Sequence, residues 1–150
     1  MNKPNSRPST AAAPAPRGGK ALSTKTKNII VQNFLQMLNS VKLYHWNTTS
    51  YAEHKASDEL YSQLNGNIDQ FVEVLLGKDA SRVRIVAHHI ALVDFRNTRT
   101  LREKMFEYRV FLTDMSTYLN PKKDSDLLNI RDEMLGNINQ FLYLISLSTP

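Results

Sequence analysis

Residues 52–76, AEHKASDELYSQLNGNIDQFVEVLL, decide the fold because their large apolar side chains recur every three or four positions. That spacing places the apolar groups on one face of an α-helix and the polar groups on the other. Gly77 follows directly and predicts the end of the helix. The segment therefore predicts one long amphipathic helix, whose apolar face consists of Leu60, Leu64, Ile68, Phe71 and Leu75.

Three other segments show the same helical spacing and surround this one. The first runs from Ser23 or Thr24, the expected N-cap, to near Trp46, and the others cover residues 98–119 and 125–147. Residues 78–97 connect the second and third helices as a brief helix or a packed loop. Four amphipathic helices of about 20 residues predict an all-α four-helix bundle. The expected core positions outside the second helix are Ile30, Phe34, Met37, Leu38, Val41, Tyr44, Leu101, Met105, Tyr108, Leu112, Met115, Leu128, Leu135, Ile138, Phe141, Leu142 and Ile145.

A short repeat links the second and fourth helices. Residues 66–71, GNIDQF, match residues 136–141, GNINQF, and the offset of 70 residues pairs the first two helices with the last two. The match suggests an internal duplication. Where the second helix has Asp69 and Glu73, the fourth has Asn139 and Tyr143, so this helical position does not need carboxylates in order to pack. Gly66 lies inside the helical pattern and is expected to let a neighbouring helix approach closely.

The positive charge is concentrated at the N-terminus. The net charge of the chain is +5, but residues 1–27 carry six basic side chains and no acidic one, which leaves −1 for residues 28–150. Residues 1–22 are rich in Pro, Ala, Ser and Gly, so they predict a disordered arm ahead of a bundle at 23–150. A transit peptide for organelle import is the rival interpretation, and four prolines oppose it. A cationic arm can bind nucleic acid through Lys3, Arg7, Arg17, Lys20, Lys25 and Lys27.

The composition also excludes several classes of protein. The chain has no cysteine, so disulfides, thiolate metal sites and thiol nucleophiles are excluded. Any metal must be bound by nitrogen and oxygen, which suits iron, manganese or zinc. No apolar run approaches the roughly 20 residues that span a bilayer, and no secretory signal precedes the bundle. These features predict an intracellular protein without a membrane partner.

Four ionisable side chains form their own stripe beside the apolar face of the second helix. His54 and Asp58 are one pair at positions i and i+4, and Asp69 and Glu73 are another. The 11 residues between Asp58 and Asp69 correspond to about 16 Å along the helix axis, too far for one metal ion. An antiparallel second copy of the helix, related by a twofold axis near residue 64, would place each pair against the other.

His45, at the end of the first helix, can supply a second nitrogen ligand to this site. Its alternative role is to cap the first helix. Trp46 is interpreted as a core or interface residue rather than a redox participant. His88 and His89 are adjacent and face different ways on a helix, so they are interpreted as packing or surface residues.

The order HW, then HxxxD, then DxxxE eleven residues after the first Asp resembles the ferroxidase signature of the Dps family, the ferritin-like DNA-binding proteins from starved cells. The resemblance implies a metal site between subunits, with Trp46 beside it. It implies one or two iron ions, as Fe2+ or Fe3+, at a dimer interface. One subunit would supply His45, His54 and Asp58, and its partner would supply Asp69 and Glu73.

The resemblance also implies a function. Fe(II) would be oxidised at this site, commonly by hydrogen peroxide, and iron and peroxide would be sequestered or detoxified during oxidative stress. The partners would be further copies of the chain, from a dimer to a dodecameric cage, and DNA bound through the arm. The protein would then be cytoplasmic or DNA-associated. The alternative function is a DNA-binding or architectural four-helix protein with little or no ferroxidase activity.

Overall fold

The computed structural model describes residues 21–85, 89–95 and 97–148. Its elements are α1 (Thr24–Asn47), α2 (Tyr51–Gly77), α3 (Thr98–Asp114), the short 3-10 helix η1 (Met115–Thr117) and α4 (Ser125–Ser146). No strand occurs in these described ranges, so the predicted all-α four-helix bundle is confirmed. Most of the predicted arm, residues 1–20, and His88 lie outside the described residues.

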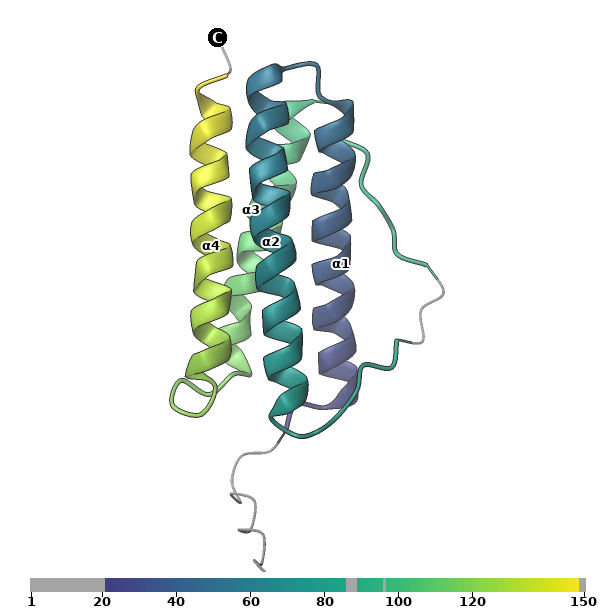
Figure 1. Cartoon of the computed structure of the whole chain (residues 1–150), viewed down its shortest axis with the longest axis vertical. Helices are drawn as coiled ribbons and strands as arrows, with labels where there is room; N and C mark the ends of the chain where they lie inside the picture. The colour runs from purple at the N-terminus through teal and green to yellow at the C-terminus, as the bar shows by residue number, and fades with distance from the viewer. Residues whose placement is uncertain (1–20, 86–88, 96, 149–150) are drawn as a thin grey trace, which may run out of the picture.

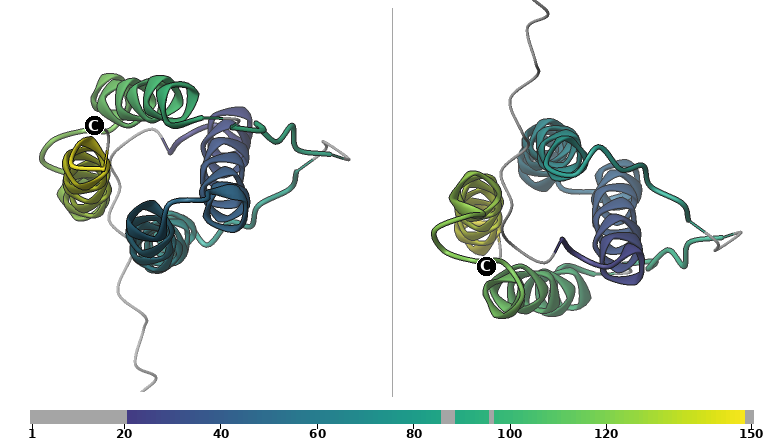
Figure 2. Two further views of the ribbon diagram at one scale, coloured as in Figure 1. Left: turned by 90° about the horizontal axis from the view of Figure 1, so that it is seen from above. Right: turned by 90° about the horizontal axis from the view of Figure 1, so that it is seen from below.

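The helices form two antiparallel pairs (Figure 1). A turn of three residues, 48–50, joins α1 to α2. The connector, residues 78–97, then runs back along the bundle, so that α3 lies parallel to α2 and α4 returns in the opposite direction (Figure 1). Seen end-on, the four helices surround one central core (Figure 2). One long crossover between two antiparallel pairs is the connectivity of ferritin-like bundles.

The connector is a loop that is fastened to the outer side of α1. The Asn28 side-chain amide donates to the Arg84 carbonyl oxygen at 2.6 Å, and the Gln36 amide donates to the Ala91 carbonyl oxygen at 2.9 Å. Two turns of α1 separate these bonds, so they hold the loop along the helix rather than at one point. Of the two predicted alternatives, the described part of the connector is the packed loop.

The predicted core is confirmed in α1, α2 and α3, where every expected apolar position is buried. In α4 the second half is also correct, but the first half is shifted by one residue. Leu128 and Leu135 are only half-buried, whereas the preceding Leu127 and Met134 are fully buried. Ile130 belongs to the same buried face. Leu127 and Leu128 are adjacent, so the sequence pattern fits either register of α4. Packing against the other helices decides which of the two leucines is buried.

The two copies of the repeat meet in the bundle. Asn137 donates a side-chain hydrogen bond to the Oδ1 of Asn67 at 2.9 Å, and these residues occupy equivalent repeat positions. The equivalent Ile68 and Ile138 are both buried. Equivalent positions of the two repeat copies thus contact each other between α2 and α4, which the repeat alone did not predict. The expected close approach at Gly66 is wrong within the subunit, because a Cβ atom there would meet nothing within 4 Å.

The third helix ends earlier than predicted. It was expected to reach Leu119, but the α-helix ends at Asp114 and continues only as η1. The buried guanidinium of Arg131, on α4, donates to the carbonyl oxygen of Leu112 at 3.0 Å and to the hydroxyl of Ser116 at 2.9 Å. An arginine that binds the last carbonyl groups of a helix stabilises its C-terminus.

None of the helices in the described residues combines the length and the apolar character needed to cross a membrane.

Candidate metal centre

The candidate site lies at the end of the bundle where α1 passes into α2 (Figure 1). We call this end apical, and the opposite end, where α1 and α4 begin, basal. Ser50 is the N-cap of α2, because its hydroxyl accepts from the backbone N–H of Glu53 at 3.3 Å. Such a cap satisfies an N–H group that the first helical turn leaves unpaired. It fixes the start of α2 and thereby the position of His54.

His45 and His54 face each other across this turn. Their rings stack with centroids 3.9 Å apart and an interplanar angle of 24°. The Nδ1–H of His45 donates to the carbonyl oxygen of His54 at 3.0 Å, and the Nδ1–H of His54 donates to the carbonyl oxygen of His45 at 2.9 Å. A carbonyl oxygen only accepts, so both bonds require a proton on Nδ1. With the proton on Nδ1, Nε2 is the ring nitrogen left to bind a metal ion.

Asp58 brings a carboxylate to this histidine pair. Its Oδ1 lies 3.7 Å from the Nε2 of His45 and 3.7 Å from the Nζ of Lys42. The Asp58 side chain is 48% exposed and that of His45 is 9% exposed, so the carboxylate lies at the surface with the imidazole behind it. The Lys42 ammonium also lies 4.5 Å from the centre of the Tyr61 ring. Lys42 thus supplies the positive charge that a bound metal ion would otherwise supply.

Asp69 and Glu73 lie on the second half of α2, and both are exposed. The 11 residues from Asp58 to Asp69 correspond to about 16 Å of helix. Across the described ranges, no group of three or more His, Cys, Asp or Glu side chains is arranged to hold a metal ion. In one subunit the two imidazoles stack and Asp58 lies near His45, but these three side chains do not form a group that could hold an ion. Asp69 and Glu73 lie further along α2, as the helical spacing predicts.

Two large aromatic side chains are exposed beside the histidine pair. Trp46 is 68% exposed and Tyr51 is 78% exposed. The Trp46 ring lies 5.7 Å from the Nζ of Lys42, which places it next to Asp58. Trp46 is therefore not a core residue of the subunit. Neighbouring exposed aromatics are typical of surfaces that contact another protein, which favours the interface interpretation of Trp46.

An open groove adjoins the carboxylate of Asp58. It has a volume of about 640 Å³ and lies between the apical halves of α2 and α4. Its walls combine the aliphatic groups of Ala56 and Leu147 with the charged groups of Lys55 and Glu59. The outer side of Asp58 is thus open to solvent, to an ion or to another chain.

Glu53 is the residue that the sequence did not reveal. Its buried carboxylate accepts hydrogen bonds from three hydroxyl groups, those of Tyr44 at 2.5 Å, Thr48 at 2.9 Å and Thr98 at 2.8 Å. These partners belong to α1, the turn and α3. The carboxylate therefore ties three segments together directly beneath the histidine pair. The one local signal was the pattern Ser-x-x-Glu at 50–53, which is typical of a helix start.

Tyr44 shows the electrostatic effect of this cluster. Burial raises the pKa of its phenol, and the hydrogen bond to Glu53 raises the pKa further. The bonds from Thr98 and Thr48 act in the opposite direction, although they do not reverse the shift. Tyr44 therefore stays protonated and remains a hydrogen-bond donor to the carboxylate at neutral pH.

The predicted nucleic-acid contacts divide into three groups. Lys3, Arg7, Arg17 and Lys20 lie outside the described residues. Lys25 is exposed at the start of α1. Lys27 does not fit the prediction of an exposed contact. Its side chain is only 6% exposed, forms an ion pair with Asp79 and donates to the Ser81 hydroxyl at 2.7 Å. These bonds fasten the connector to α1, so Lys27 is not free to contact a polyanion.

By its fold and its candidate site, the protein is an all-helical bundle that carries histidine and carboxylate side chains at its apical end. The model of a protein family described as a family of unknown function, DUF5856, matches residues 45–145. This range is more than half of the chain and contains all five predicted metal ligands, and the chain belongs to this family. A search of curated proteins and a search of solved structures each gave no match.

Proposed function

We propose that the protein is a Dps-like iron-binding protein that oxidises Fe(II) between two copies of the chain. The observation that carries this proposal is the cluster of His45, His54 and Asp58, in which Nε2 of each imidazole is left to bind a metal ion beside an exposed carboxylate. Imidazole and carboxylate together are a suitable ligand set for iron. This half-site lacks enough ligands in one subunit, and the groove and exposed aromatics beside it suit a second copy.

The second copy would complete the ligand set. An antiparallel arrangement of the two α2 helices, about a twofold axis near residue 64, would bring Asp69 and Glu73 of one chain to the histidine pair of the other. Each dimer would then contain two equivalent sites. Asp58 and Glu73 would be the main charged ligands, and Asp69 would bind the ion or orient another ligand through water.

Iron is the substrate in this proposal. Two Fe(II) ions each give up one electron, and hydrogen peroxide takes both electrons and two protons to form two molecules of water. The carboxylates stabilise the higher charge of Fe(III) more strongly than that of Fe(II), which favours the loss of the electron. The protein would thereby remove both Fe(II) and peroxide, and it would store the Fe(III) product if the dimers assemble into a closed cage.

The test measures peroxide-dependent Fe(II) oxidation by the full chain and by two variants, Asp58→Ala and Glu73→Ala. We expect both variants to oxidise Fe(II) no faster than a solution without protein. Glu107→Ala is the matched control, because Glu107 is an exposed carboxylate of α3 that belongs neither to the ligand set nor to the groove beside Asp58. Oxidation at the wild-type rate by Asp58→Ala would contradict the proposal.

A second candidate function is DNA binding with little iron turnover, and the charge distribution favours it. Residues 1–27 carry six basic side chains and no acidic one, and α1, which begins within this stretch, starts at the basal end (Figure 1). Removal of residues 1–22 should then weaken DNA binding. Equal binding by the shortened chain would reject the arm as the binding element. DNA binding without iron oxidation would favour this candidate over the first.

A further inference from the structure

The basal end of the bundle carries an excess of positive charge that is independent of the N-terminal arm. Residues 23–27, 78–84 and 114–126 contain seven Lys or Arg side chains and four Asp side chains. Lys27 and Lys78 pair with three of those four carboxylates, Asp79, Asp124 and Asp126. The remaining cations form no ion pair within the described part of the chain: Lys25, Arg82, Arg84, Lys122 and Lys123.

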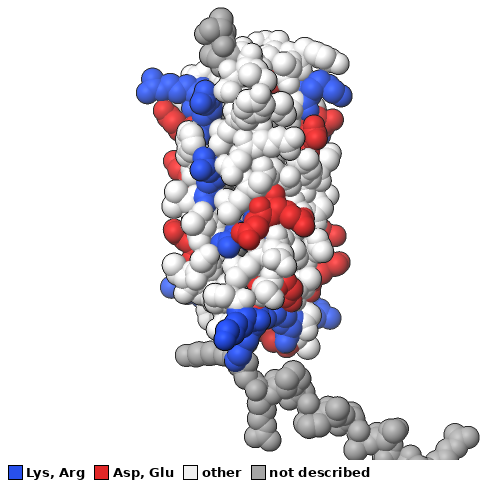
Figure 3. Space-filling model, turned by 90° about the vertical axis from the view of Figure 1, so that its left-hand side faces the viewer, with Lys and Arg blue, Asp and Glu red and all other residues white. Residues whose placement is uncertain are grey.

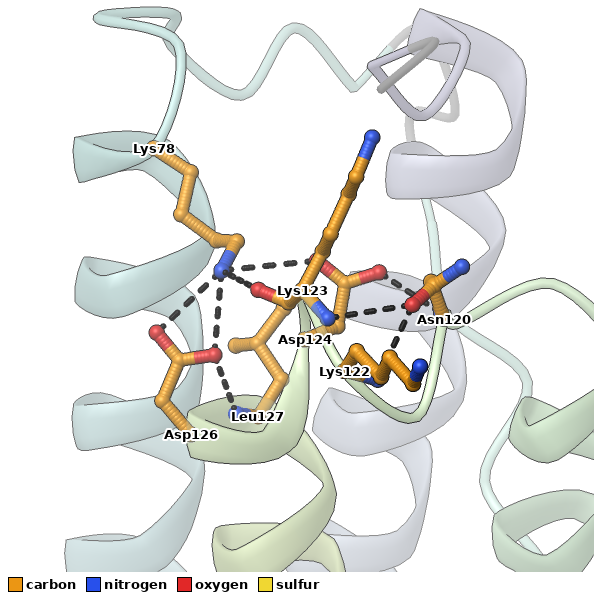
Figure 4. A network of polar contacts seen from close by, with 7 residues as sticks. All are labelled: Lys78, Asn120, Lys122, Lys123, Asp124, Asp126 and Leu127. Carbon is orange, nitrogen blue, oxygen red and sulfur yellow. Dashed lines mark hydrogen bonds and ion pairs between the residues drawn. The ribbon is translucent and has the colours of Figure 1, made fainter. Parts of the chain in front are cut away.

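The loop between α3 and α4 carries two of these cations in a turn that is fixed by side-chain hydrogen bonds (Figure 4). The Asn120 side-chain oxygen accepts from the backbone N–H of Lys122 at 2.9 Å and of Lys123 at 3.0 Å. The Asp124 carboxylate accepts from the backbone N–H of Asn120 at 2.7 Å. The hydrogen bonds of Asn120 and Asp124 thus fix the conformation of the loop backbone. The lysine side chains extend from the loop, and their ammonium groups take part in none of the contacts drawn in Figure 4.

Lys78 joins this loop to the start of the connector. Its ammonium donates to the Lys123 carbonyl oxygen at 2.7 Å and to the Asp126 carboxylate at 3.0 Å, and it lies 3.4 Å from the Asp124 carboxylate (Figure 4). The pKa of Lys78 is raised, since these two carboxylates outweigh the opposite effect of its partial burial. Lys78 therefore neutralises the carboxylates of Asp124 and Asp126. The ammonium groups of Lys122 and Lys123 remain available to an external partner.

The connector presents the other two arginines from a backbone that is equally fixed. The Arg84 carbonyl oxygen is bound by Asn28 of α1, and the residue before Arg82, Ser81, is bound by Lys27. Figure 3, seen from the α4 side, shows Lys and Arg side chains at the lower, basal end with Asp and Glu side chains among them, and further Lys and Arg side chains near the upper end. The five cations thus lie at the basal end of the bundle, on the start of α1 and on two anchored loops.

We propose that these five side chains, Lys25, Arg82, Arg84, Lys122 and Lys123, form a structured contact surface for the phosphate backbone of duplex nucleic acid. The proposal rests on the second candidate function, DNA binding, and adds to the arm a rigid surface on the bundle. A flexible arm and a fixed basic surface at the same end can neutralise phosphates together, and each neutralised phosphate releases counterions.

The surface suits a duplex better than the other polyanions that a cell offers. Single strands bind by stacking bases on exposed aromatic rings, and membrane surfaces are bound by exposed apolar side chains next to the charges. Of the large exposed apolar residues of the described ranges, Ile29 is one helical turn from Lys25, but it is a single aliphatic side chain, and none of the exposed aromatic ones belongs to residues 23–27, 78–84 or 114–126. Charge without aromatic rings fits contacts to a duplex backbone, which carry no sequence information.

The test compares full-length variants in binding a labelled DNA duplex over a range of salt concentrations. Lys122→Gln with Lys123→Gln removes two basal charges, and Lys55→Gln with Arg99→Gln removes two exposed charges near the apical end as the matched control. The basal pair should weaken binding roughly tenfold at 0.1 M salt and lower the slope of log affinity against log salt by about 2. The control pair should change affinity less than about twofold, as expected for charges away from the contact.

Three outcomes overturn the inference. They are equal losses for the two pairs, no loss for the basal pair, and no duplex binding by the wild type. If the basal pair binds normally while removal of residues 1–22 abolishes binding, the arm remains the binding element and only this inference fails. Iron oxidation is also measured on the basal pair, and it should be unchanged because Lys122 and Lys123 are at the opposite end from His45 and His54.

Discussion

The imidazole rings of His45 and His54 stack at 3.9 Å, and each donates from Nδ1 to the backbone carbonyl oxygen of the other residue. This reciprocal arrangement fixes the tautomer and the orientation of both rings before any metal arrives. In metal sites such outer hydrogen bonds hold the ligand ring and raise its basicity. The end of α1 and the start of α2 therefore hold the two imidazoles as one stacked pair, which is the arrangement that the proposed iron site uses.

Removal of one ring tests this interpretation. His54→Ala deletes one Nε2 ligand and the ring that stacks on His45, so we expect Fe(II) or Co(II) affinity to fall by at least about 10- to 100-fold. Titration calorimetry or Co(II) absorption measures the change. His89→Ala is the control, because His89 is an exposed histidine of the connector and should have no effect. Equal affinities for all three proteins would remove the histidine pair from the site.

The ammonium of Lys42 competes with a metal ion for the carboxylate of Asp58, since their charged atoms are 3.7 Å apart. Lys42→Met should therefore raise metal affinity by roughly two- to fivefold, the range expected for the loss of a partly exposed ion pair. Lys55→Met removes an exposed lysine of α2 and should leave the affinity unchanged. Weaker binding by Lys42→Met would mean that Lys42 supports the site through packing on Tyr61 instead.

The buried carboxylate of Glu53 should stabilise the whole apical end. Glu53→Ala leaves three hydroxyl donors without their acceptor, so we expect the free energy of unfolding to fall by about 3 kcal/mol. Glu53→Gln retains one acceptor oxygen, so its free energy of unfolding should fall by about half as much. Urea unfolding measures both, with Glu59→Ala as an exposed control that should change stability by less than about 0.5 kcal/mol. A loss for Glu53→Ala as small as that control would show that the cluster is not stabilising.

The ion pair between Lys27 and Asp79 predicts a specific dependence of stability on pH. The hydrogen bond from the Lys27 ammonium, together with that from Ser81, holds the pKa of Asp79 below its usual value of 3.8. A carboxyl group with a lowered folded pKa contributes stability above its unfolded pKa, and that contribution is lost as the pH falls through the folded pKa. Asp79→Asn should thus be less stable than wild type at pH 7, and the difference should shrink below about pH 4. A difference that stays constant from pH 7 to pH 3 would contradict this account.

The sequence was sufficient for most of the fold because helical periodicity and caps are local signals. Ser23 caps α1, Gly77 ends α2, and the apolar stripe of α2 is buried throughout, all as predicted. The end of α3 could not be predicted, since it depends on Arg131, which reaches the Leu112 carbonyl from another helix. The apolar spacing alone predicted a helix up to Leu119, several residues too late.

The candidate site shows the same division between local and tertiary information. His54 and Asp58 lie one helical turn apart, so their proximity follows from spacing alone. The role of Glu53 depends on Thr98, which is 45 residues away in the chain. The burial of Lys27 depends on Asp79, which is 52 residues away. No pattern within one helix contains either pairing, so both became visible only when the helices and the connector were placed in space.

The most direct test of the central claim, a site shared between two chains, is complementation between subunits. Asp58→Ala and Glu73→Ala chains carrying different affinity tags are mixed through unfolding and refolding, and the mixed dimers are isolated by both tags. Each mixed dimer would contain one doubly altered site and one intact site. We predict that each parent variant is inactive and that the mixed dimer oxidises Fe(II) at about half the wild-type rate. Mixed dimers that form and remain inactive would contradict the account.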